Sequence, residues 1–161
     1  MTTQVKPVPA GYHTITPGLT FKQAARAMDW YKQAFGAEEV MRMDGPGGAI
    51  MHAELRIGDS IFFVNDEMPQ GGSRAPETLK GTSGGMFLYV ENVDAVVKRA
   101  AEAGAKVTMP PQDMFWGDRF GKVTDPFGHQ WGIATHVEDV APEEIGKRAQ
   151  AFFAKAAGQH S

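Results

Sequence analysis

The sequence predicts an α+β fold made of two tandem βαβββ modules followed by a C-terminal helix. The main observation is an internal repeat, because "LTFKQAARAMDWYKQAFGAEEV" and "LYVENVDAVVKRAAEAGAKV" share a strand, a helix and a glycine-containing stop at nearly equal spacing. A second observation is that strand-like segments follow both stretches. One such unit buries only one face of its sheet and needs its twin to complete the architecture. The 161 residues therefore suit a single domain, 1–161, that contains both modules.

The first module is expected at about 12–66. It begins with a short strand in "TITPGLTF", and the following "KQAARAMDWYKQAF" has the apolar spacing of an amphipathic helix. Gly36 ends that helix, at a position where helices favour a residue that tolerates positive φ. Three further strands are predicted in "EEVMRMD", "AIMHAELRI" and "DSIFFVND", with turns between them.

A loop of about 67–84 separates the modules, since "EMPQGGSRAPETLKGTSGG" is rich in Gly, Pro and Ser and lacks periodicity. The second module is expected at about 85–138, with a strand, a helix closed by Gly104, an extended segment broken by proline, and two closing strands around a "DPFG" turn. A helix at about 142–157 carries Phe152 and Phe153 on one side. We expect these rings to be covered by the domain itself or by a partner subunit.

Composition excludes several classes of function. The net charge of −3 and the scattered lysines and arginines give no basic surface for nucleic acid. The absence of cysteine removes disulfides and thiolate ligands, so any metal would need His, Asp or Glu. No apolar run has the length of a signal peptide core or a membrane span, so no membrane partner is expected and a cytoplasmic location is the default.

Aromatic residues gather in "DMFWGDRFG". Phe115, Trp116 and Phe120 lie within six positions together with Asp118 and Arg119. An aromatic wall with one guanidinium suits a flat or anionic small molecule, through stacking and bidentate hydrogen bonds. The alternative is a structural tryptophan beside an Arg–Asp surface pair.

Two polar side chains share one face of the predicted strand "IMHAELRI". Strand alternation sets His52 and Glu54 opposite the apolar positions of that strand. A histidine with an adjacent carboxylate can act as a general base with an orienting partner, or can hold a polar ligand. A solvated strand face with a mild ion pair is the alternative.

The repeated pattern, the strand "IMHAELRIGDS" and the closing "FWGDRFGKVTDPFGHQWGIATHVEDV" resemble the vicinal oxygen chelate superfamily, which includes glyoxalase, bleomycin-resistance and extradiol dioxygenase proteins. Within this superfamily, the sequence is most similar to the PhnB-like group. The resemblance covers roughly 12–140. It implies modules whose strands curl into a mixed sheet with a cleft, usually in a homodimer, and it places His52 and Glu54 on the concave side.

Metal-dependent members of that superfamily carry ligands on the first and last strand of each module. The resemblance assigns these positions to Thr16, Phe62, Gly85 and Gly132. Phenylalanine and glycine offer no donor, whereas a divalent ion needs about three protein ligands. We therefore expect no metal cofactor, although a site built from other positions stays open. Gly132 either makes room for a ligand or relieves packing against Trp116 or Trp131.

Two functional hypotheses follow. The first is a metal-independent protein that binds a small flat or polar ligand in the cleft. Its ligand-binding residues would be Thr16, Phe62, Trp116, Arg119, Phe120 and Gly132. The second is a metal-dependent lyase or isomerase of the glyoxalase type, with His52 and Glu54 as its catalytic residues. The missing metal ligands favour the first.

Overall fold

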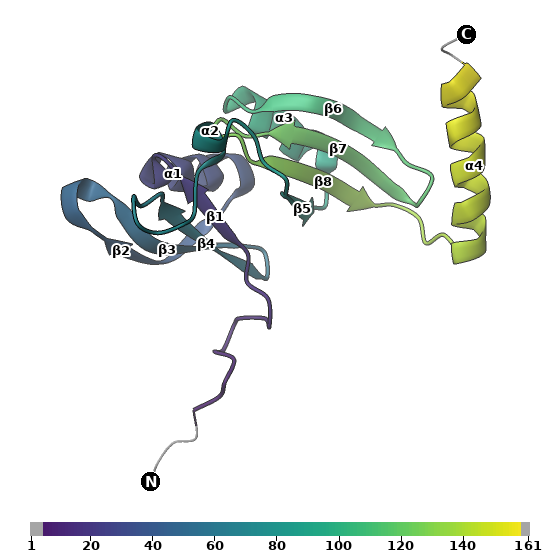
Figure 1. Cartoon of the computed structure of the whole chain (residues 1–161). Coiled ribbons are helices and arrows are strands. Elements are labelled where there is room, and N and C mark those ends of the chain that lie inside the picture. Colours follow the sequence, from purple (N-terminus) through teal and green to yellow (C-terminus); the bar gives the residue numbers. More distant parts are fainter. Residues whose placement is uncertain (1–4, 159–161) are drawn as a thin grey trace. The chain divides into compact units, whose positions relative to one another are not determined.

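The computed structural model describes residues 5–158 of the chain and confirms the α+β class. The fold divides into two compact units, with the boundary between Thr82 and Ser83 (Figure 1). Each unit holds one four-stranded mixed sheet with a helix against one face. The first and last residues of the predicted domain, 1–4 and 159–161, lie outside the described residues. Within 5–158, no helix combines the length and apolarity needed to cross a bilayer.

The first unit forms one complete βαβββ module. Its sheet has the order β1-β4-β3-β2, in which β1 runs parallel to β4 and the other pairs are antiparallel. Helix α1 packs on this sheet through fully buried side chains that include Met28 and Tyr31. It ends at Gly36, whose φ of 68° is left-handed, as the sequence predicts. The elements are β1 (Gly18–Phe21), α1 (Ala24–Phe35), β2 (Glu38–Asp44), η1 (Pro46–Gly48), β3 (Ile50–Ile57), β4 (Ser60–Asp66) and α2 (Pro76–Leu79).

The second unit repeats this topology. Its sheet has the order β5-β8-β7-β6, with β5 parallel to β8. Helix α3 buries Val93, Val97 and Ala100 against β6, β7 and β8. The elements are β5 (Gly85–Tyr89), α3 (Val93–Glu102), β6 (Lys106–Asp113), β7 (Asp118–Thr124), β8 (Gln130–His136) and α4 (Pro142–Gly158).

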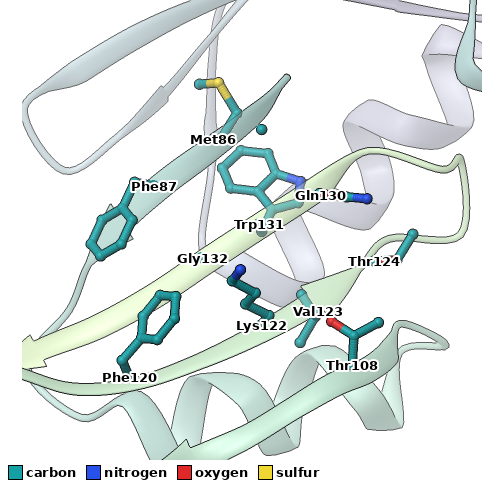
Figure 2. Close-up of a pocket in the computed structure, with 11 residues that line it drawn as sticks. Met86, Phe87, Thr108, Phe120, Lys122, Val123, Thr124, Gln130, Trp131 and Gly132 are labelled. Carbon is teal, nitrogen blue, oxygen red and sulfur yellow. The ribbon is translucent and has the colours of Figure 1, made fainter. Parts of the chain in front are cut away.

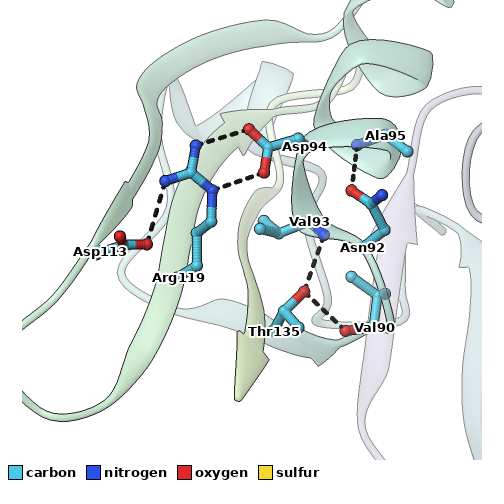
Figure 3. A network of polar contacts seen from close by, with 8 residues as sticks. All are labelled: Val90, Asn92, Val93, Asp94, Ala95, Asp113, Arg119 and Thr135. Atoms are coloured by element: carbon cyan, nitrogen blue, oxygen red, sulfur yellow. Dashed lines mark hydrogen bonds and ion pairs between the residues drawn. The ribbon is translucent and has the colours of Figure 1, made fainter. Parts of the chain in front are cut away.

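In both modules, the start of the helix is held by the same kind of long-range hydrogen bond. In each, a side chain on the last strand accepts a hydrogen bond from the first backbone N–H of the helix. Asp66 Oδ1 accepts from Ala24 N at 2.7 Å, and Thr135 Oγ1 accepts from Val93 N at 2.9 Å. Both bonds join residues 42 positions apart. Figure 3 shows the second of them, together with the Asn92 side chain that caps the same helix through Ala95 N at 3.0 Å.

Two segments differ from the prediction. The first strand begins only at Gly18, because Pro17 cannot donate a ladder hydrogen bond and the strand pairs with β4 from Gly18 onward. The segment 67–84 contains helix α2, which contacts β1. Glu67 fixes α2 by accepting hydrogen bonds from Ala75 N at 2.9 Å and Thr78 Oγ1 at 2.7 Å.

Helix α4 forms where it is predicted but buries none of its side chains. Phe152 and Phe153 contact the ring of Phe115, with centroid distances of 5.5 and 6.1 Å. Arg148 adds a bidentate ion pair with Glu138, at 2.8 Å for both bonds. The expectation that the two rings are covered is met only partly, because Phe153 remains 63% exposed.

Candidate functional site

The open face of the second sheet, defined here as the face opposite α3, carries the candidate site. Phe87 and Lys122 pair with Gly132 from either side, so these three residues lie side by side across β5, β8 and β7. Phe120 occupies the same face two positions before Lys122 (Figure 2). Arg119 immediately precedes Phe120 in β7, so its side chain lies on the opposite face of the sheet, where it contacts Asp94 of α3.

Two phenylalanine rings stack across Gly132. The rings of Phe87 and Phe120 are 5.4 Å apart and nearly parallel, at 5°. A Cβ at Gly132 would lie 2.9 Å from Phe120 Cε2 and 3.0 Å from Phe87 Cδ2, which is closer than carbon atoms pack. Glycine is therefore what permits the stack. The alternative that Gly132 relieves packing against Trp116 or Trp131 is wrong, because the close partners are Phe87 and Phe120.

A cavity of about 350 Å³ opens over this stack. This volume is at the lower end of the range of about 300–1,000 Å³ that is typical of ligand sites. Lys122 Nζ lies 5.8 Å from the centroid of the Phe120 ring. The lining residues come from all four strands of the second sheet and are Gly85, Met86, Phe87, Thr108, Phe120, Lys122, Val123, Thr124, Gln130, Trp131 and Gly132.

The "DPFG" turn fixes one wall of the cavity. Asp125 is 4% exposed, and its Oδ1 accepts hydrogen bonds from Phe127 N at 3.0 Å and His129 N at 2.9 Å. Its Oδ2 accepts from Trp131 Nε1 at 3.1 Å. One buried carboxylate thus holds the turn and the indole of Trp131 together.

A second buried carboxylate lies further along the open face. Asp118 is 3% exposed and accepts hydrogen bonds from Trp116 Nε1 at 2.9 Å and from Tyr89 Oη at 3.3 Å. His136 Nδ1 lies 2.8 Å from Asp118 Oδ1, and its Nε2 lies 2.9 Å from Asp139 Oδ1. Asp139 first, and then Asp118, raises the pKa of His136 above its ordinary value.

This carboxylate orients the aromatic residues that continue the cavity wall. The Trp116 ring meets Phe120 edge-on at 5.8 Å, and Tyr89 contacts Phe87 at 5.0 Å. Trp116 was predicted for the wall and lies beside it. No sequence motif singles out Tyr89, Phe87 or Lys122. They come together through the strand register, which cannot be obtained from sequence spacing.

Arg119 lies on the α3 side of the sheet and does not face the cavity. Its guanidinium binds Asp94 through two bonds, of 2.6 and 2.8 Å, and Asp113 through a third of 3.1 Å (Figure 3). The pair lowers the pKa of Asp94 and raises that of Arg119. The proposed anion-binding role of Arg119 is therefore wrong, because Asp94 and Asp113 occupy its donors and tie β7 to α3 and β6.

In the first unit, His52 and Glu54 lie side by side as expected. His52 Nε2 is 3.1 Å from Glu54 Oε1, and the hydroxyl of Tyr12 donates to Glu54 Oε2. This bond to Glu54 raises the pKa of Tyr12. The His52 ring contacts Phe63 edge-on at 4.8 Å. Glu54 is 9% exposed, so the strand face is not simply solvated.

Two of the residues predicted to bind a ligand lie elsewhere. Phe62 is 3% exposed and packs edge-on against Tyr31 of α1 at 5.7 Å, so it belongs to the helix-side core. Phe63 occupies the opposite face, beside Glu54. Thr16 precedes β1 and is not part of the sheet. The placement of Phe62 on the ligand side is thus wrong by one residue, which in a strand reverses the face.

Metal-dependent members of the superfamily that the sequence resembles hold a divalent ion, and the donor set of this chain does not fit one. Gly85 and Gly132 line the cavity with no side chain, and Phe62 is in the core. Within residues 5–158, no group of three or more His, Cys, Asp or Glu side chains is arranged to hold a metal ion. Both oxygens of Glu54 already have partners in Tyr12 and His52.

Comparisons with known proteins agree with this fold. An uncharacterised protein of Mycobacterium bovis is 43% identical over 134 residues, which are 81% of this chain and 88% of that protein. The crystal structure of TioX from Micromonospora sp. ML1 matches with a TM-score of 0.62 and 31% identity, over 78% of this chain and 99% of TioX. A PhnB protein from Bacillus cereus, at 23% identity over 76% of this chain and 99% of its own, shares the fold with a TM-score of 0.58.

The family model for the Glyoxalase/Bleomycin resistance protein/Dioxygenase superfamily matches residues 12–133. That span begins just before β1 and ends within β8, so it includes every sheet strand of both modules except the last residues of β8. The chain belongs to the glyoxalase, bleomycin resistance and dioxygenase superfamily.

Proposed function

We propose that this protein binds a small planar ligand in the cavity of the second sheet and does so without a metal ion. The observation that carries the proposal is the parallel Phe87–Phe120 pair over Gly132, which gives the cavity an aromatic floor. Aromatic side chains pair favourably with another π surface in offset-stacked or edge-to-face arrangements. Phe87 is 51% exposed, so a planar molecule reaches its ring without rearrangement of the sheet.

Metal independence is supported by the chemistry of the positions that would hold a metal. The two glycines of the cavity have no side chain and so offer no metal ligand. Asp118 and His136, which lie near the open face, are bound to each other. Ligand recognition would then rest on stacking and on a few polar groups at the rim, as in many small-molecule sites.

The test is a thermal shift screen of chelator-treated protein against small planar compounds, with Gly132→Val as the variant that fills the cavity floor. A compound that raises the melting temperature of the wild type and not of Gly132→Val supports the proposal. Gly18→Val is the matched control, because Gly18 is also a strand glycine and an added Cβ there meets nothing within 4 Å. A hit that Gly132→Val binds as well as the wild type would place the ligand elsewhere.

A second candidate, proton transfer at His52, has its own supporting observation. Tyr12 and His52 hold the two oxygens of the buried Glu54, so the carboxylate orients the imidazole as in a base with an orienting partner. The metal-dependent lyase or isomerase would use the same pair. Elemental analysis separates the two functions: stoichiometric nickel, zinc, manganese or iron(II) that His52→Ala and Glu54→Ala both abolish would support the lyase and contradict the metal-free proposal.

We also propose a homodimer and a cytoplasmic location. The dimer is supported by Phe153, which Phe115 leaves largely exposed on α4. Light scattering of the purified protein measures the assembly, and a monomer at all concentrations would contradict the dimer.

A further inference from the structure

The charges around the cavity are unbalanced. Lys122 is the one charged residue that lines it, and no Asp or Glu is among the lining residues. The other polar side chains there, Thr108, Thr124 and Gln130, are neutral. The cavity therefore offers a cation and several neutral hydrogen-bonding groups to whatever enters it.

Lys122 has no carboxylate partner in the part of the chain that the structure describes. Other cations close to acidic residues are paired: Lys32 lies 2.7 Å from Glu39, and Arg148 lies 2.8 Å from Glu138. Lys122 instead sets its ammonium 5.8 Å from the centroid of the Phe120 ring. A ring face attracts a cation but leaves its hydrogen-bond donors unused.

The short distance between the Lys122 ammonium and the Phe120 ring suits a ligand that combines a planar group with an acidic group. A planar group stacked on the exposed ring of Phe87 would lie near Lys122, because Lys122 and Phe87 both neighbour Gly132. An acidic substituent on that planar group would reach the ammonium without leaving the ring surface. An ammonium substituent would instead meet a like charge with no compensating carboxylate in the lining.

We infer that the ligand of this cavity is a planar aromatic anion, such as an aromatic carboxylate, whose ring stacks on the exposed ring of Phe87 and whose acidic group binds Lys122. This inference rests on the proposed function, because it names the class of ligand for the same cavity. Lys122 is exposed, so solvent screens the pair and the selectivity it gives is modest.

The experiment compares three probes with one ring system: 2-naphthoate, 2-naphthylmethanol and 2-naphthylmethylammonium. Isothermal titration calorimetry of the chelator-treated full chain at low salt is expected to show 2-naphthoate binding about twofold to fivefold more tightly than the alcohol. The ammonium compound is expected to bind most weakly. Added salt should reduce the preference for the anion, because it screens the Lys122 charge.

Lys122→Met keeps the apolar stem and removes the charge, so it should bind the anion and the alcohol about equally. Lys106→Met is the matched control, since Lys106 is an exposed lysine on β6 that does not line the cavity, and it should keep the preference. Equal binding of all three probes by the wild type, or a preference that Lys122→Met retains, would overturn the inference and leave a planar-ligand site. Failure of every probe to bind would count against the proposed function, and the inference would fall with it.

Discussion

Asp125 offers the sharpest test of how the closing turn supports the cavity. Replacing it with alanine removes an acceptor from three donors at once: Phe127 N, His129 N and Trp131 Nε1. Trp131 is 2% exposed, so its indole N–H cannot turn to bulk water after the substitution. Asp125→Ala should therefore destabilise the protein more than a surface substitution does.

The expected loss in free energy of unfolding can be estimated from the three donors that bond to Asp125. A buried donor left without an acceptor costs about 1–3 kcal/mol, and this applies to the Trp131 indole. The two turn amides each lose a hydrogen bond to a charged group, and water replaces part of each, so they add about 1 kcal/mol apiece. The total is about 3–5 kcal/mol, a large share of the roughly 5–15 kcal/mol that stabilises a domain.

The assay is urea unfolding monitored by tryptophan fluorescence, with Asp113→Ala as the control. Asp113 binds Arg119 from the surface, with 76% of its side chain exposed, and its loss should cost less than about 1 kcal/mol. Asp125→Asn should fall between the two, because it keeps one acceptor oxygen. If Asp125→Ala and Asp113→Ala lose the same free energy of unfolding, the structural role assigned to the turn is refuted.

Two further predictions concern the second unit. Thr135→Val keeps the side-chain shape but removes the acceptor of Val93 N, so it should lower the free energy of unfolding by about 1–2 kcal/mol and speed amide exchange at the start of α3. Asp139 and Asp118 raise the pKa of His136, so its stabilising contribution is complete below the ordinary pKa of about 6.5 and is lost as pH rises through the raised value. The melting temperatures of wild type and His136→Gln should therefore converge at alkaline pH, and a difference that does not depend on pH would contradict this.

The repeat could be predicted from the sequence because its signals are local. Apolar spacing in "KQAARAMDWYKQAF" and the stop at Gly36 depend only on nearby residues, and the structure places a helix that ends there. The short helix α2 was not predicted. This helix is a single turn, which is too short to give a periodic signal. The hydrogen bond that holds it, from Ala75 N to Glu67, crosses a Gly-rich segment.

The candidate site was less accessible to sequence analysis, because strand registers and long-range partners decide it. Phe62 and Phe63 are chemically identical neighbours, and only the pairing with β3 shows that Phe63 faces His52 and Glu54. The sequence suggests a ligand contact at Arg119 because its partner Asp94 lies 25 residues earlier in the chain, where no local pattern reveals the ion pair. Gly132 was singled out correctly as unusual, but its partners Phe87 and Phe120 come from two other strands.

The two equivalent helix caps bear on the order in which each module becomes stable. Residues 24–35 of the first helix leave the ribosome well before Asp66, and the same 42-residue delay separates Val93 from Thr135. Until the last strand arrives, the first amide of each helix can bond only to water. The last strand therefore completes both the sheet and the helix cap, so the first amide of each helix gains its protein acceptor only when the final strand of its module is in place.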